Sequence, residues 1–215
     1  MTGGREARSE KTRQRLLEAT VTVIGDIGYE AATTRMLAGA AEANLSAIPY
    51  HFGGKKELYL AAARMIGDYA AERLTEVAAP LAGEAPPALR LEAALNSLLL
   101  LILSDQPSMP WTAFLARCCH ENDAAFALIH DTAIAPMVAR MVAVAGELHG
   151  PDTPREILQL RILSIVTAII SFRFLRGILL RGMAWEEIQD SGVKQMQRMI
   201  HDLCQSGFLL IPTTH

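Results

Sequence analysis

Apolar side chains recur at helical spacing along almost the whole chain, and no stretch shows the alternation of a half-buried strand. In the first predicted helix, Leu16, Ile24 and Ile27 fall on one face, and Gly28 follows as a typical C-terminal stop. The pattern therefore predicts an all-α fold. Two short helices should begin near residues 33 and 44, and longer helices should span about 10–27, 55–77, 88–104, 108–121, 123–148, 154–181 and 185–206.

Length and composition favour a packed globule over a disordered chain. The chain has 215 residues, of which 51% are hydrophobic, enough for one sizeable core or for a small domain docked on a larger one. Its net charge of −3 is unlike that of a wholly basic nucleic-acid binder. Residues 1–56, however, hold eight Lys and Arg against six Asp and Glu, so this end is the better place for phosphate.

Cysteine usage and hydropathy indicate a cytoplasmic protein with no membrane association. Three cysteines do not make the even, spaced set of a disulfide framework, so reduced thiols are expected. Residues 1–14 are polar and lack the apolar segment of a signal peptide. The longest apolar run, residues 162–172, is shorter than the ~20 residues of a membrane span, which predicts a buried helix.

Residues 33–59, TTRMLAGAAEANLSAIPYHFGGKKELY, have the length and polarity of a helix-turn-helix. In such a unit the second helix enters the major groove of DNA while the first crosses the backbone. Two closely crossing helices need small or apolar residues between them. The residues predicted to pack this unit together are Leu37, Ala38, Ala41, Leu45, Ile48 and Phe52.

The remaining residues of this segment are candidates for DNA contact. Hydroxyls and small side chains suit base edges and thymine methyl groups, a role predicted for Ser46, Ala47, Pro49 and Tyr50. Phosphate contacts, which fix register without reading sequence, are predicted for Tyr50, His51, Thr33, Lys55 and Lys56. The full predicted DNA-binding set is Thr33, Thr34, Arg35, Asn44, Ser46, Ala47, Pro49, Tyr50, His51, Lys55 and Lys56.

The segment from about Ser9 to Ile66 resembles the TetR family of transcriptional repressors. The resemblance rests on residues 28–34, GYEAATT, and most specifically on residues 50–59, YHFGGKKELY. The wording AIPYHFGGKKELYLA is also similar to the subset with a CerR/CecR-type C-terminal domain.

The resemblance implies an all-α homodimer without a cofactor. An N-terminal three-helix helix-turn-helix DNA-binding domain is expected at residues 9–69, and a C-terminal helical domain for effector binding and dimerisation at 70–215. It also implies binding to a palindromic operator in double-stranded DNA, from which an unknown small-molecule effector releases the protein.

Two residues depart from the family pattern. Glu42 stands where the family usually has a turn glycine, so a positive φ would strain its backbone and its carboxylate would lie near DNA. Pro49 falls inside the predicted recognition helix, where it would remove the hydrogen bond to Leu45 and disfavour helical geometry at Ile48. Both departures bear on affinity and docking.

The effector site is predicted among the helices of the C-terminal bundle, where facing helices hold ligands. Aromatic, methionine and arginine side chains are the plausible lining, although such residues at helical spacing are more often core. An arginine in an apolar helix needs a partner, either an anionic effector or solvent. The candidates are Trp111, Phe114, Arg117, Met137, Met141, Phe172 and Arg173.

Metal binding and catalysis are disfavoured by spacing. Cys118, Cys119 and His120 are adjacent on a helix and point about 100° apart, so they do not readily share one ion. A simpler interpretation is that Cys118 or Cys119 belongs to the core. No catalytic set can be assembled from the histidines, so we expect neither a metal site nor an enzyme.

Two apolar stripes predict the dimer interface within residues 154–206. Two such helices from each protomer would form a four-helix bundle across a twofold axis, and a palindromic operator requires that symmetry. The alternative is that both stripes serve the protomer's own core. The stripes consist of Ile157, Leu160, Val166, Ile170 and Phe174, and of Val193, Met196, Met199, Ile200 and Leu203.

The sequence therefore predicts a cytoplasmic, ligand-responsive transcriptional regulator that acts as a repressor. The alternatives are an all-α small-molecule-binding protein or enzyme without DNA binding, and a helical adaptor. Salt-dependent binding to duplex DNA separates these readings, because phosphate contacts make affinity fall steeply with salt.

Overall fold

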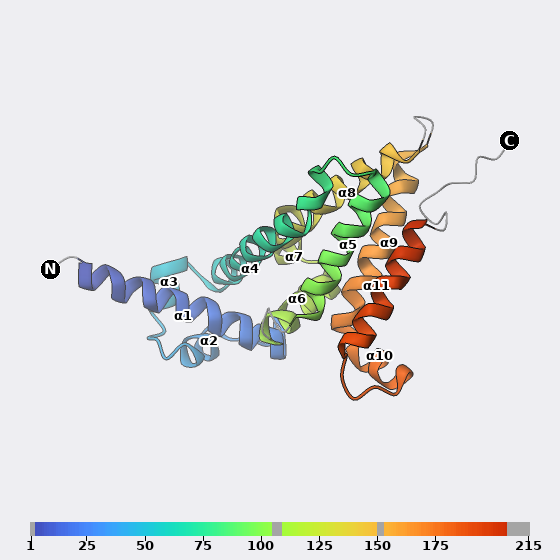
Figure 1. Cartoon of the computed structure of the whole chain (residues 1–215). Helices are drawn as coiled ribbons and strands as arrows, with labels where there is room; N and C mark the ends of the chain where they lie inside the picture. Colours follow the sequence, from blue (N-terminus) through green and yellow to red (C-terminus); the bar gives the residue numbers. More distant parts are fainter. Residues whose placement is uncertain (1–2, 105–108, 150–152, 206–215) are drawn as a thin grey trace. The chain divides into compact units, whose positions relative to one another are not determined.

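The computed structural model describes residues 3–104, 109–149 and 153–205, and within these ranges the protein is α-helical without strands (Figure 1). The all-α prediction is confirmed. The breaks predicted between residues 104 and 108 and between residues 148 and 154 lie partly outside the described residues. The helices are α1 Gly3–Ile27, α2 Thr34–Ala40, α3 Ala47–Phe52, α4 Lys55–Val77, α5 Pro87–Leu103, α6 Met109–Glu121, α7 Ala124–Ile129, α8 Ala135–Glu147, α9 Arg155–Phe174, α10 Arg176–Met183 and α11 Asp190–Gln205.

The described residues form two compact units, each built from two separate stretches of chain. The first unit holds residues up to 70 together with 109–133, and the second holds 71–104 together with 134–205. The division between residues 70 and 71 falls inside α4. Residues 109–133 belong to the same unit as the N-terminal helices, and α6 packs against α1.

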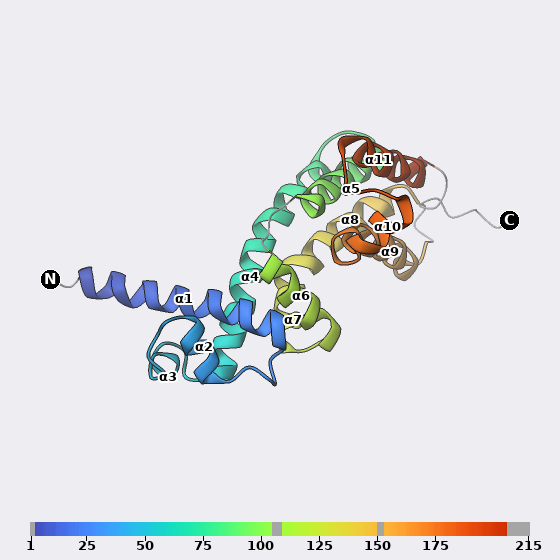
Figure 2. The ribbon, with the colours of Figure 1, turned by 90° about the horizontal axis from the view of Figure 1, so that it is seen from below.

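The core of the first unit is formed by α1, α2, α3, the first part of α4, α6 and α7. In Figure 2, α2 and α3 lie beside α1, which they also contact. Leu16, Leu37, Ile48, Leu58 and Phe114 are all fully buried here. Ile27, predicted to face this core, is 39% exposed because α1 ends at that residue.

Helices α1 and α6 approach so closely at Gly25 that any larger residue would force the two helices apart by a few tenths of an ångström. A Cβ atom on Gly25 would lie 3.1 Å from both the amide nitrogen of Phe114 and the carbonyl oxygen of Pro110. Nearby, the Arg117 guanidinium donates to the carbonyl oxygens of Gly25, at 3.2 Å, and Asp26, at 3.0 Å. Carbonyl groups in the last turn of a helix have no partner within it, so Arg117 caps α1 from a neighbouring helix.

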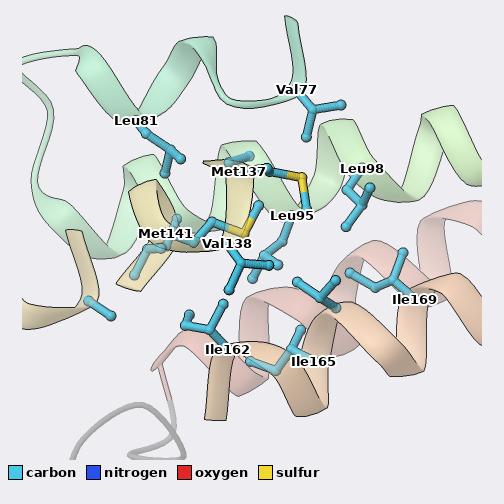
Figure 3. Packing of buried hydrophobic residues seen from close by; sticks show 14 of the residues in the cluster. Val77, Leu81, Leu95, Leu98, Met137, Val138, Met141, Ile162, Ile165 and Ile169 are labelled. Atoms are coloured by element: carbon cyan, nitrogen blue, oxygen red, sulfur yellow. The ribbon is translucent and has the colours of Figure 1, made fainter. Parts of the chain in front are cut away.

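The core of the second unit lies between α5, α8 and α9, with α11 against α5. Figure 3 shows Leu95 and Leu98, Met137 and Met141, and Ile162 and its neighbours converging from these three helices. The segment between α4 and α5 is not irregular throughout. Ala79–Ala82 forms one 3₁₀ turn that buries Leu81, and α5 starts at Pro87 as expected for proline at a helix start.

Two long helices predicted as continuous are interrupted. The helix predicted at 123–148 contains a π-helical turn, His130–Ile134, just before Pro136. Proline lacks the N–H that the α-helical ladder requires, and a widened turn accommodates it. The helix predicted at 154–181 ends at Phe174, and Leu175, with φ −111° and ψ 25°, separates α9 from α10.

The last predicted helix starts five residues later than expected, at Asp190. The Trp185 ring occupies the space beside Gly192, since a Cβ atom there would lie 2.8 Å from ring carbons. The bulky indole therefore packs against the first turn of α11, outside that helix. Ala184, with φ +54°, ends α10 in the left-handed conformation.

Candidate nucleic-acid interface

The first helix of the candidate interface is capped as the sequence predicts. Thr33 is the N-cap of α2, and its side-chain oxygen accepts a hydrogen bond from the Met36 amide at 3.2 Å. The second helix is predicted to begin near residue 44, but Asn44 instead orders the turn that precedes it. Its Oδ1 accepts from the amide and the hydroxyl of Ser46, both at 3.0 Å, and Ser46 becomes the N-cap of α3.

Packing holds α3 through a single buried residue. Leu37, Ala38 and Ala41 on the α2 side and Ile48 on α3 are all buried, as predicted. The prediction for Leu45 is wrong, since it is 48% exposed. Helix α3 begins only at Ala47, so Leu45 lies in the turn before it and does not share the face of Ile48.

The opposite side of α3 faces solvent. Ser46, Pro49 and Tyr50 are exposed, and Tyr50 is 78% exposed, which is unusual for so large an aromatic side chain. Ala47 and His51 are half-buried, and the Tyr50 and His51 rings meet edge to face at 4.9 Å. Thr33, Thr34, Arg35 and Asn44 are also exposed, around the start of α2 and the turn.

The two lysines occupy the first turn of α4 but differ in their surroundings. The chain leaves α3 at Gly53, whose φ of +91° is a conformation that glycine adopts without strain. Lys56 is exposed. Lys55 is half-buried, and its Nζ lies 4.2 Å from the centroid of the Tyr29 ring.

Glu42 adopts the strained turn expected of it. Its φ is +46°, so a non-glycine residue occupies the left-handed region, at a cost of about 1–2 kcal/mol. Its carboxylate accepts from the Arg15 guanidinium at 2.6 Å. The sequence did not predict this partner, which offsets the negative charge beside the interface.

Contrary to the prediction, Pro49 does not disturb α3. It is the third residue of a helix that begins at Ala47, and amides of a first helical turn have no partner within the helix. No hydrogen bond inside α3 is lost, and the Tyr50 amide still donates to the Ser46 carbonyl at 3.2 Å. The proline ring also presents a rigid apolar surface to solvent beside Tyr50.

Comparison with known proteins decides the family. The model for the tetR family of bacterial regulatory proteins matches residues 16–62. The model for the C-terminal domain of the HTH-type transcriptional dual regulator CecR matches residues 87–208, more than half of the chain. The chain belongs to the TetR family. Its C-terminal part is of the CecR type, as the sequence resemblance indicated.

Relatives cover almost the whole length of this TetR-family chain. It is 27% identical over 202 residues to the transcriptional dual regulator CecR of Shigella flexneri, covering 90% of this chain and 89% of that protein. A TetR-like regulator from Rhodococcus sp. RHA1 superposes with a TM-score of 0.62 at 16% identity, over 93% of this chain and 97% of that chain. The AibR regulator, solved in complex with isovaleryl coenzyme A and operator DNA, gives 0.59 at 17% identity, over 89% and 97%.

These matches establish what kind of protein this is. The family models and the CecR relative identify a DNA-binding transcriptional regulator. The solved structures share its fold. The α2–α3 unit described above is therefore the DNA-binding helix-turn-helix of the TetR family, although the individual residues that contact DNA stay a prediction.

The seven predicted effector residues are divided between the two units. Trp111, Phe114 and Arg117 belong to the first unit, where Phe114 is wholly buried and Trp111 packs edge to face against Tyr69 at 5.1 Å. The other four belong to the second unit: Met137, Met141, Phe172 and Arg173.

Both arginines of that set bind backbone carbonyls. Arg117 caps α1, and Arg173 donates to the carbonyl oxygens of Ile102, at 3.2 Å, and Ser104, at 2.8 Å, at the end of α5. Capping a neighbouring helix thus gives each arginine a structural role. The sequence pattern could not reveal it, because the partners lie about 70–90 residues away.

The prediction that Cys118 belongs to the core is confirmed. Its side chain is fully buried and its Sγ lies 3.2 Å from the Tyr59 hydroxyl, whereas Cys119 is exposed. Burial raises the pKa of the Cys118 thiol to about 12, so it stays protonated at neutral pH. The described residues contain no group of three or more potential metal-binding side chains.

The predicted dimerisation stripes are only partly used by the protomer's own core. Val166, Met196 and Ile200 are buried within the second unit. Leu160 is 67% and Met199 42% exposed. Six large apolar side chains on α9, α10 and α11 and at Leu175 are exposed: Ile157, Leu160, Leu175, Ile178, Met183 and Met199. We call this set the α9–α11 apolar surface.

Two helical segments are long and apolar enough to cross a membrane, judged by length and composition alone: Ala124–Glu147 and Arg155–Phe174. The second contains the apolar run 162–172, which by itself is shorter than a membrane span. Both supply buried residues to the second core, such as Met141 and Ile162. Core helices of soluble proteins can be equally long and apolar, so length and composition are weak evidence of a membrane span.

Proposed function

We propose that this regulator is a cytoplasmic homodimeric repressor, without catalytic activity, that binds a palindromic operator and is released by a small-molecule effector. The observation that carries the DNA-binding part is the geometry of α3. Ile48 anchors the helix to the core while Ser46, Pro49 and Tyr50 present an exposed face, as a helix that enters a groove requires.

In this proposal α3 reads sequence and its flanks hold the backbone. The small polar and apolar groups of Ser46, Ala47 and Pro49 suit base edges and thymine methyl groups. Tyr50 and His51 suit either bases or phosphates. Thr33 and Arg35 at the start of α2 and Lys56 at the start of α4 suit phosphates on the two sides of the groove.

The start of α4 adds a second phosphate-binding feature. The first amides of this 23-residue helix follow Gly53 and Gly54, so backbone N–H groups and the helix dipole favour an anion at this end. Arg15, paired with Glu42, limits the repulsion between that carboxylate and DNA. These features support DNA binding despite the chain's net charge of −3.

The α9–α11 apolar surface supports dimerisation. Large exposed apolar patches on soluble proteins usually mark interaction sites, and a twofold operator requires a twofold protein. The exposed members on α9 and α10, such as Leu160 and Ile178, have no role in the protomer's core. In a twofold dimer, the same surface of a second protomer would cover these side chains.

We place the effector among the helices of the second unit. Of the predicted lining residues, Met137, Met141 and Phe172 belong there. Buried Oδ1 of Asn96 on α5 has no hydrogen-bond partner within the described part of the chain. A buried acceptor without a partner carries a cost that a donor group on a ligand would remove. Asn96 therefore joins the candidates.

The proposal is tested by binding of fluorescein-labelled duplex DNA at several salt concentrations, followed by selection of bound sites from random duplexes. We expect affinity that falls steeply with salt and selected sites that contain an inverted repeat. A helical small-molecule-binding protein or enzyme without DNA binding would show neither property. Tyr50→Ala should weaken binding while leaving helix content unchanged, because Tyr50 is exposed.

A further inference from the structure

A chain of contacts links Lys55 to the start of α7 through two tyrosines. Lys55 Nζ lies 4.2 Å from the Tyr29 ring centroid. The Tyr29 ring stacks on the Tyr59 ring, with centroids 4.7 Å apart and planes at 30°. The Tyr59 hydroxyl then donates to Asp123 Oδ2 at 2.6 Å. We call Tyr29 and Tyr59 the tyrosine pair.

The Lys55 end of this chain is a cation held over an aromatic face. A lysine side chain at a helix start normally samples many rotamers, and ordering it on DNA costs entropy. An ammonium group over an aromatic ring is attracted by the ring's quadrupole. Burial and the nearby Glu30 and Glu57 carboxylates raise the pKa of Tyr29, so its ring faces the ammonium as a neutral phenol.

The Tyr59 end is buried and fully hydrogen-bonded. Tyr59 is 5% exposed, and a buried hydroxyl needs a partner. Asp123 supplies it with Oδ2, while its Oδ1 accepts from the amides of Ala125, at 3.0 Å, and Phe126, at 2.9 Å, as the N-cap of α7. One carboxylate therefore joins the first turn of α7 to the first turns of α4.

These four residues come from three separate parts of the chain. Tyr29 lies between α1 and α2, Lys55 and Tyr59 on α4, and Asp123 before α7. The core alone would be served by phenylalanine at position 59, since the hydroxyl adds nothing to apolar packing. The network places the hydroxyl where it fixes the end of α4 that carries Lys55.

We propose that Tyr29 and Tyr59 are positioning residues for phosphate binding by Lys55, and that Asp123 anchors them to α7. The ring of Tyr29 holds the ammonium group in place before DNA arrives. Tyr59 fixes the Tyr29 ring through stacking, and the bond to Asp123 fixes Tyr59. This inference rests on the proposed function, in which the start of α4 contacts phosphate.

A double-mutant cycle tests the role of Tyr29. Binding of a fluorescein-labelled 20-base-pair duplex is measured by anisotropy, over a series of KCl concentrations, for Tyr29→Leu and Tyr29→Phe in the wild-type and Lys55→Ala backgrounds. In the wild-type background Tyr29→Leu should weaken binding about threefold to fivefold, the equivalent of an exposed cation–π contact. Tyr29→Phe keeps the ring and should bind as the wild type does.

The Lys55→Ala background distinguishes positioning from general destabilisation. Without the lysine there is nothing left to position, so Tyr29→Leu should cause no further loss of affinity. Equal losses in both backgrounds would mean that Tyr29 acts only through the fold. Equal binding by the leucine and phenylalanine variants would also overturn the inference.

Tyr59→Phe tests the anchor with a smaller change, in case Tyr29→Leu fails to fold. It keeps the stacked ring and removes only the hydroxyl. We expect about a twofold to threefold loss of affinity, and again no further loss in the Lys55→Ala background. Circular dichroism and stoichiometric titration confirm that each variant is folded. Unchanged affinity, or a loss that persists without Lys55, would contradict the anchoring role.

The same experiment separates this inference from the proposed function. A wild-type protein without salt-dependent DNA binding would refute both. Wild-type binding that Lys55→Ala leaves unchanged in affinity and salt slope would remove Lys55 from the interface and overturn the inference alone.

Discussion

Substitution of Gly25 by alanine should loosen the contact between α1 and α6 on which the first unit is built. The new Cβ would lie 3.1 Å from two backbone atoms of α6, the Phe114 nitrogen and the Pro110 oxygen. Backbone atoms cannot rotate away, so α6 must withdraw by a few tenths of an ångström. Overpacking of this kind costs about 1–3 kcal/mol. Against it stands a gain of about 0.5–1 kcal/mol from replacing a helical glycine.

Gly67 provides a matched control within the same unit. It is also buried in a long helix that faces another helix, but its added Cβ would lie 3.5 Å from Ile129 Cα, an ordinary contact distance. Gly67→Ala should therefore gain the same ~0.5–1 kcal/mol without the steric cost. The difference between the two variants isolates that cost, about 1–3 kcal/mol.

Thermal unfolding by circular dichroism measures the difference. For a chain of this size each kcal/mol corresponds to about 2–4 °C, so Gly25→Ala should melt about 2–12 °C below Gly67→Ala. Amide hydrogen exchange should show the loosening in α1 and α6 and leave α5 and α9 unchanged. If Gly25→Ala were as stable as Gly67→Ala, the close approach of α1 and α6 would be wrong.

Three further predictions concern the turn, the dimer and the thiols. Glu42→Gly relieves the strain of a φ of +46° and loses only an exposed ion pair with Arg15. The melting temperature and the operator affinity should therefore both rise, and a fall in melting temperature would contradict this. Leu160→Glu should leave helix content unchanged but give a monomer by sedimentation, and a mutant that stays dimeric would remove Leu160 from the interface. Iodoacetamide at pH 8 should modify Cys119 in the native protein and spare Cys118, as mass spectrometry can show.

The raised pKa of Cys118 also determines how the free energy of unfolding changes with pH. Burial moves this pKa from 9.0 to about 12, so the folded state keeps a proton that the unfolded chain loses between these values. The stability contributed by the thiol is therefore complete below about pH 9 and declines as pH rises towards 12. Cys118→Ala should make the unfolding free energy fall less steeply over that range in urea titrations, and an unchanged slope would contradict the assignment.

The sequence predicts helices well where apolar periodicity is regular and terminal signals are local. Helix α4 occupies Lys55–Val77 as predicted, and Thr33 caps α2 through its own side chain. The prediction fails where periodicity continues through a break. Apolar residues continue on both sides of the π-helical turn before Pro136 and of the interruption at Leu175, so their spacing reveals neither break.

The candidate interface follows from local sequence, but its supports do not. The exposed face of α3 is predictable because Ser46, Pro49 and Tyr50 lie within one short motif. Leu45 fits the core pattern only for a helix that begins near residue 44, whereas α3 begins at Ala47. The Arg15–Glu42 ion pair and the Tyr59–Asp123 hydrogen bond join residues 27 and 64 positions apart, and no periodic pattern within one helix encodes such pairs.

The salt dependence of duplex binding tests the central claim most directly. If each protomer of a dimer places Arg35, Lys55 and Lys56 near phosphates, the six contacts should give a logarithmic plot of the binding constant against salt a slope of about −5. Lys55→Ala should reduce that slope by about one unit for each protomer bound. Absence of duplex binding, or a slope near zero for the wild-type protein, would contradict the proposal that this helix-turn-helix docks on DNA.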